Sequence, residues 1–165
     1  MPPATSYSTY LGDLEPVSTM RSNIDRIRAV TKGWTKDQFD RMLAPGKWNA
    51  RQILLHLAQT EMALGNRARM ALATPSYAAQ RFDQDAWVDR ETRITGSEAL
   101  EALAAMSRMN AALFEGLSQT DREITMSHPE YGSITVDWII HLLPGHRMHH
   151  LAQLQTIAAD LRGSY

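Results

Sequence analysis

Apolar residues recur at helical spacing in the first half of the chain. Met20, Ile24 and Ile27 stand at i, i+4 and i+7, so they predict a helix that starts near Pro16 and ends at Gly33. A short helical turn is predicted over residues 35–42. Ile53, Leu57 and Leu64 predict a second long helix, which runs to about residue 73 before Pro75 stops it. Asn49 and Gln52 have the spacing of a capping box at its start.

The second half contains two further helical stripes. Ser97 is the expected cap of a third long helix, whose stripe is Leu103, Met106, Leu113 and Leu117. Thr135 opens the last helix, which is predicted to continue to Leu161 with a kink at Pro144. Residues 123–134 alternate briefly and predict a small hairpin or an extended turn. Residues 77–96 show no period and are expected to form a long loop.

These elements predict an all-α fold, a four-helix bundle with a long loop between helices two and three. At 165 residues the chain has room for one domain with a sizeable core and no comfortable room for two. We therefore expect a single domain over residues 1–165, with residues 1–13 loosely ordered.

Composition and charge exclude several classes of function. The formal net charge is −1, which argues against a nucleic-acid partner, because phosphate binding needs a basic face. No segment approaches the ~20 apolar residues that span a bilayer, and the N-terminal residues do not resemble a secretory signal, so no membrane partner and a cytoplasmic location are expected. The chain has no cysteine and six histidines, so a metal would need nitrogen or oxygen ligands.

Four of the six histidines lie within ten residues of one another in the last predicted helix. Residues four apart on a helix sit ~40° apart with Cβ atoms about 5–6 Å from each other, so His146 and His150 point the same way and can share one ion. His149 could replace His150 as the partner of His146, but the apolar stripe favours His150. His141 stands five residues before His146 and is a poor ligand.

A third ligand must come from another helix, and His56 is the candidate. It lies at the edge of the apolar face of the second long helix, where an unpartnered imidazole would be costly. Two simpler interpretations stay open on these residues alone. His56 could be a core histidine that is hydrogen-bonded to a carbonyl, and His146 and His150 could belong to a solvated helix face.

Three stretches of the sequence resemble the DinB-like family of bundle proteins, also called the damage-inducible or YfiT-like family. They are APGKWNARQILLHLAQTE, FDQDAW and ITVDWIIHLLPGHRMHHLAQL. The family pattern places a tryptophan eight residues before a helix-two histidine, here Trp48 and His56. A histidine pair in the last helix is followed by a leucine and a glutamine, here His146, His150, Leu151 and Gln153.

The resemblance implies one divalent metal ion on His56, His146 and His150, with zinc or nickel the leading candidates. Three imidazoles leave coordination positions open, which is typical of catalytic sites. The family includes thiol-dependent transferases and proteins assigned as metal-dependent hydrolases. The partner is then a small-molecule substrate or a low-molecular-weight thiol, and a homodimer is expected. The alternatives are a non-catalytic, stress-related metal-binding protein and a plain bundle with structural histidines.

Several other side chains are candidates for the surroundings of the ion. His149, Gln153 and Gln52 are expected to support the ligands from outside. Phe82 and Trp87, from the long loop, could line a pocket. If the loop folds over the metal, one of Asp83, Asp85 and Asp89 could act as a general base. Trp34, Trp48 and Trp138 are expected to belong to the core.

Overall fold

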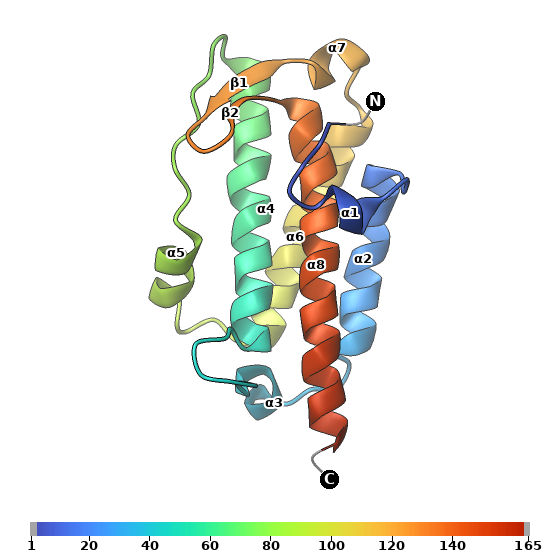
Figure 1. The fold of residues 1–165 in the computed structure, drawn as a ribbon, viewed down its shortest axis with the longest axis vertical. Coiled ribbons are helices and arrows are strands. Elements are labelled where there is room, and N and C mark those ends of the chain that lie inside the picture. The colour runs from blue at the N-terminus through green and yellow to red at the C-terminus, as the bar shows by residue number, and fades with distance from the viewer. Residues whose placement is uncertain (1–2, 164–165) are drawn as a thin grey trace.

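Four long helices run side by side along one axis in the computed structural model, which describes residues 3–163 (Figure 1). They are α2 (Pro16–Val30), α4 (Ala50–Ala73), α6 (Gly96–Glu115) and α8 (Val136–Gly163). The predicted all-α four-helix bundle is therefore confirmed. None of the helices in the described residues is long and apolar enough to cross a membrane.

The order of the helices around the bundle differs from their order along the chain. Helix α2 packs against α6 and α8, and α4 packs against the same two helices, so consecutive α2 and α4 lie diagonally. In Figure 1, α2 and α8 run downwards while α4 and α6 run upwards. Because α4 and α6 are parallel, their connection, residues 74–95, must return along the whole bundle.

That connection contains a helix that the sequence analysis missed. We expected residues 77–96 to be a loop, but α5 (Gln84–Arg90) forms within them, with the Asp83 carboxylate accepting a hydrogen bond from the Ala86 N–H. Only Val88 of this helix is buried, so no apolar period marks it. Earlier in the connection, residues 77–79 pair with Ser127 through two backbone hydrogen bonds.

Capping boxes set the starts of several helices. The short helix α3 (Lys36–Asp40) is capped by Thr35 and Gln38, and α4 is capped by Asn49 and Gln52, both as the spacing predicts. Helix α6 differs, because its cap is Thr95 with Glu98 rather than Ser97. The Glu98 carboxylate reaches back to the Thr95 N–H, and Ser97 has no glutamate or glutamine three residues on.

The N-terminal segment is more structured than expected. Residues 1–13 were predicted to be loosely ordered, yet α1 (Ser8–Leu11) packs against α8, and Leu11 is buried. Residues 1 and 2 lie outside the described residues. The close approach depends on Gly145 of α8, where an added Cβ would lie 2.7 Å from the carbonyl oxygen of Tyr7. A segment with one buried apolar residue carries no periodic signal, which explains the miss.

A short hairpin closes one end of the bundle between α6 and α8, after the single-turn helix α7 (Gln119–Arg122). Strands β1 (Thr125–His128) and β2 (Gly132–Thr135) are antiparallel, with Met126 opposite Ile134. This is the hairpin alternative that the sequence allowed for residues 123–134. Gly132, the first residue of β2 after the turn, has φ 71°, a conformation that favours glycine.

A buried ion pair crosses the middle of the bundle, next to the histidines. Arg147 of α8 and Glu61 of α4 are 1% and 2% exposed, and they contact each other directly. Arg147 also donates to Ser107 of α6 and to the Met20 carbonyl of α2. Glu61 accepts from the Asn110 amide of α6, 2.7 Å away. All four long helices therefore meet at this network. Each of the two buried charges therefore has the other as its ion-pair partner.

Candidate metal centre

Three histidines from two helices converge inside the bundle. His56 lies on α4 and His146 and His150 lie on α8, and their exposed fractions are 2%, 5% and 6%. The Nε2 atom of His146 is 3.0 Å from the Nε2 atom of His56 and 3.0 Å from that of His150. The three residues form a group that could hold a metal ion, with ligand atoms all within 4.8 Å of one another.

The helical phase of α8 decides which histidine joins this group. His146 and His150 are one turn apart and face α4. His149 is half-buried and turns towards the N-terminal segment, where its Nδ1 atom lies 2.9 Å from the Tyr10 hydroxyl. The preference for His150 over His149 that the apolar stripe indicated therefore agrees with the geometry.

Gln153 orients the His150 ring from the outer side. Its Oε1 atom is 2.8 Å from His150 Nδ1, and a carbonyl oxygen can only accept, so Nδ1 carries the proton and Nε2 keeps its lone pair for the centre. The amide nitrogen of Gln153 lies 3.3 Å from His149 Nε2. Gln153 and His149 thus form the supporting chain around His150 that such ligands commonly have.

Burial keeps the three imidazoles neutral. Desolvation, followed by repulsion from His150, lowers the pKa of His56 to about 3. Desolvation also lowers the pKa of His150 to about 4, although its hydrogen bond to Gln153 acts in the opposite direction. The pKa of His146 falls well below its usual value for the same reason, helped by His150 and His56. Only the neutral form of an imidazole binds a metal, so the site is prepared for one at neutral pH.

The geometry fits a single divalent ion. Nitrogens that bind one ion at ~2.0–2.1 Å, with angles of roughly 90–110° between them, lie about 3.0–3.4 Å apart. The two 3.0 Å separations agree with this. A cluster of buried nitrogen lone pairs that face one another is otherwise repulsive, and His56 Nδ1 has no hydrogen-bond partner among the described residues.

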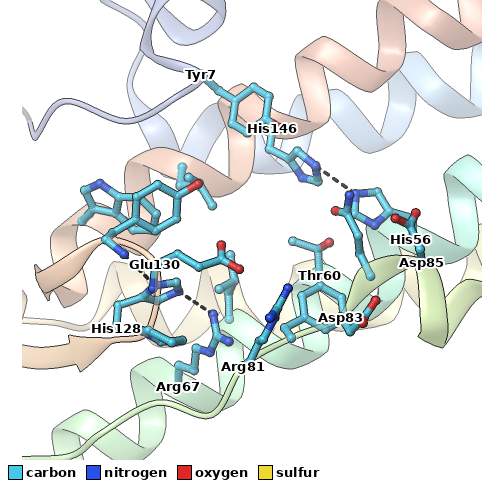
Figure 2. Close-up of a pocket in the computed structure, with 17 residues that line it drawn as sticks. Tyr7, His56, Thr60, Arg67, Arg81, Asp83, Asp85, His128, Glu130 and His146 are labelled. Carbon is cyan, nitrogen blue, oxygen red and sulfur yellow. Dashed lines mark hydrogen bonds between the residues drawn. The ribbon is translucent and has the colours of Figure 1, made fainter.

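The centre opens onto a polar cavity of about 400 Å³. Figure 2 shows His56 and His146 on one side of it and His128, Arg67 and Glu130 on the other. Helix α4 forms the floor through Thr60 and Leu64, residues 81–85 form one wall, and the hairpin and α8 complete the rim. His150 faces a second cavity, of about 470 Å³, which Trp48, Gln153 and Asp85 help to line.

A family model for the DinB superfamily matches residues 19–154. The chain belongs to the DinB superfamily. This matches the resemblance carried by the tryptophan, histidine and glutamine positions, and the matched residues include all three histidines of the centre.

Known proteins of similar sequence are named as metal-dependent hydrolases. A relative from Oceanobacillus iheyensis, named "Putative metal-dependent hydrolase", is 29% identical over 122 residues, which cover 73% of this chain and 71% of the relative. A relative of the same name from Halalkalibacterium halodurans is 23% identical over 145 residues, covering 86% and 82%.

One solved structure has the same fold. YfiT from Bacillus subtilis, described as a probable metal-dependent hydrolase with an unusual four-helix bundle topology, superposes with a TM-score of 0.79. The match covers 88% of this chain and 85% of YfiT at 23% sequence identity. At this identity the likeness supports the fold of our superfamily member and not its activity.

The other residues that the sequence suggested for the surroundings of the ion lie at different distances from the histidines and the cavity. The Gln52 side chain accepts from the Asn49 N–H in the cap of α4. This bond supports the start of the helix, whereas we had expected Gln52 to support the histidines. Asp83 and Asp85 line the cavity, and Asp89 does not. Phe82 lines it too, while Trp87 packs on the Phe82 ring at 4.8 Å and is exposed.

The three tryptophans expected in the core also differ in their surroundings. Trp138 is buried, and Trp34 and Trp48 are half-buried against the core. Trp48 additionally lies over His56, with ring centroids 4.8 Å apart, so it is part of the surroundings of the centre.

The sequence analysis missed the far end of the cavity. Arg67 and His128 are both 6% exposed there, and Arg81 and Glu130 stand beside them. One signal was available for Arg67, which follows His56 by eleven residues, just over three turns, and so shares its face of α4. His128 comes from the hairpin, and no spacing connects it to Arg67.

Proposed function

We propose that this chain is a metal-dependent hydrolase that binds one divalent ion, zinc or nickel, on His56, His146 and His150. The observation that supports this most is the convergence of three buried, neutral imidazoles, two of which line a polar cavity. The names of the relatives favour hydrolysis as the reaction. The wider family implies a competing chemistry, transfer to an electrophile from a low-molecular-weight thiol, which a cosubstrate must supply because the chain has no cysteine.

A divalent ion in this position supplies a Lewis acid that lowers the pKa of a bound water or thiol. The protein contributes the surroundings of the reacting group. The Thr60 hydroxyl lies in the cavity one turn beyond His56, is buried and has no partner among the described residues, so it can hydrogen-bond a substrate. Figure 2 shows Asp85 on the same side of the cavity as His56, where its carboxylate can take up a proton.

Metal analysis of the untagged protein tests the ligand set. His56→Ala, His146→Ala and His150→Ala should each lose most of the bound metal, because two imidazoles alone make a weak site. His141→Ala is the matched control on α8, since His141 bonds the Asp137 carbonyl at 2.9 Å and is not part of the centre, and it should keep the metal. If the His56→Ala protein binds as much metal as the natural protein, the ligand set from two helices is refuted.

Activity assays separate hydrolysis from its alternatives. The metal-loaded protein should hydrolyse small ester or amide substrates, and the His56→Ala protein should not. Turnover that requires an added thiol and an electrophile would replace hydrolysis with thiol transfer. Stoichiometric metal with neither activity would identify a non-catalytic metal-binding protein. A homodimer remains a prediction, which sedimentation velocity can test.

A further inference from the structure

The end of the cavity away from the histidines contains a buried cation without a carboxylate partner. Arg67 is 6% exposed, and among the described residues no Asp or Glu oxygen lies within 4.0 Å of its guanidinium. Its guanidinium donates to the Gln80 carbonyl, and His128 Nε2 lies 2.9 Å from its Nη1 atom. Desolvation lowers the pKa of Arg67, which shows that its charge is held at a cost. Buried charges are usually paired, and this one faces a cavity instead.

His128 cannot act as the missing acceptor. Its Nδ1 atom lies 3.1 Å and 3.3 Å from the backbone nitrogens of Glu130 and Tyr131, so it accepts from them. A neutral imidazole has one lone pair, and with Nδ1 accepting, Nε2 carries the proton. His128 Nε2, with its proton, then lies 2.9 Å from Arg67 Nη1, and a guanidinium group cannot accept a hydrogen bond. Two donors are therefore in contact, and an acceptor is needed beside them.

We propose that Arg67 and His128 bind an oxyanion group of the substrate, a carboxylate or a phosphate, at the end of the cavity opposite the three histidines. Arg81, exposed at the rim of the cavity, adds a second positive charge. This inference rests on the proposed function and specifies its substrate class, a small molecule whose reactive group and anionic group are at opposite ends. His56 and Arg67 are about 16 Å apart along α4, at ~1.5 Å per residue.

The carboxylates in the cavity define how selective this end can be. Glu130 is exposed and faces the same space, and it is close enough to raise the pKa of Arg67 without forming an ion pair. It opposes anion binding and can withdraw into solvent. Asp83 is held in the cap of α5, and Asp85 belongs to the histidine end. The Glu130→Gln variant should therefore bind an anion more tightly than the natural protein.

The test is calorimetric titration of inorganic phosphate into the metal-free protein. Arg67→Gln should weaken phosphate binding roughly 10- to 100-fold, the equivalent of one charge-assisted hydrogen bond. Arg108→Gln removes the same charge from an exposed position on α6 and should leave the affinity unchanged. Glu130→Gln should tighten binding. Equal affinity in the Arg67→Gln and natural proteins, or no binding at tens of millimolar phosphate, would overturn the proposal.

A second measurement covers the case in which Arg67→Gln does not fold. In the ¹⁵N-labelled natural protein, phosphate should shift the ring nitrogens of His128. A shift confined to His56, His146 and His150 would place the anion at the wrong end and refute the proposal. Because both measurements are made without metal, they are independent of the proposed enzyme. Failure of the protein to bind metal would refute the proposed function alone, and failure to bind phosphate would refute this inference alone.

Discussion

The metal-free protein should lose stability steeply as the pH falls from 6.5 towards 5. His56, His146 and His150 are neutral in the folded state because burial lowers each pKa, to about 3 for His56 and about 4 for His150. In the unfolded chain the same groups titrate near 6.5. Between these values the unfolded state binds more protons than the folded state, so acidification favours unfolding.

The size of the effect follows from the number of histidines. Each proton taken up on unfolding changes the free energy of unfolding by about 1.4 kcal/mol per pH unit, so three histidines give about 4 kcal/mol per unit near pH 5. From pH 7.5 to pH 5 each histidine contributes about 2 kcal/mol, and the three together about 6 kcal/mol. Total stabilities of ~5–15 kcal/mol are usual. The metal-free protein should therefore lose a large share of its free energy of unfolding by pH 5.

Urea denaturation at a series of pH values from 7.5 to 5 measures this slope. The range stops at 5 because Glu15, Glu98 and Asp121, whose pKa values are lowered by hydrogen bonds, begin to lose stabilising contacts at lower pH. In the His56→Leu variant the free energy of unfolding should change less steeply with pH, by about 1.4 kcal/mol per pH unit, because one fewer proton is taken up on unfolding. His128, whose pKa is also lowered by burial, adds to the slope in the same direction. If unfolding of the natural protein takes up one proton or less near pH 5, the three histidines are not held neutral by burial, and the prediction is refuted.

Two further perturbations test the support around the centre. Gln153→Leu removes the acceptor of His150 Nδ1 and should lower metal affinity roughly 10- to 100-fold, measured by competition with a chelator, whereas Gln155→Leu, at an exposed position of the same helix, should not. Glu61→Ala leaves Arg147 buried without its partner, so it should lower the free energy of unfolding by ~3–5 kcal/mol and the Tm by about 6–20 °C. Adding Arg147→Met should recover most of this loss. Equal losses of stability in the single and double variants would contradict the prediction.

The sequence predicted the long elements well because their signals are local. Each long helix carries an apolar stripe, and α4 carries the capping box of Asn49 and Gln52. The histidine pair of α8 could be placed by helical spacing alone. The choice of His56 as a third member needed a cross-helix inference, and the DinB-like resemblance supported it. The structure brings these three side chains together as expected.

The parts that could not be predicted depend on contacts between distant segments. Gln52 has the spacing of a cap and also stands one turn before His56, and only the structure shows that its side chain is used by the cap. Helix α5 is too short and too exposed to show a period. The pairing of Arg67 with His128 joins residues 61 positions apart, which no local pattern records.

The topology of the bundle explains why a cavity forms beside the histidines. Parallel α4 and α6 require a connection that returns along the bundle, and this connection supplies Arg81, Asp83 and Asp85 to one wall. Helices α6 and α8 lie diagonally, so the chain also needs a crossing between them, and that crossing contains the hairpin that brings His128. Helix α4 contributes to both ends, with His56 at one and Arg67 at the other. Because one straight helix carries both residues, the distance between the proposed metal and anion sites is fixed, so we expect the protein to select substrates by the distance between their reactive and anionic groups.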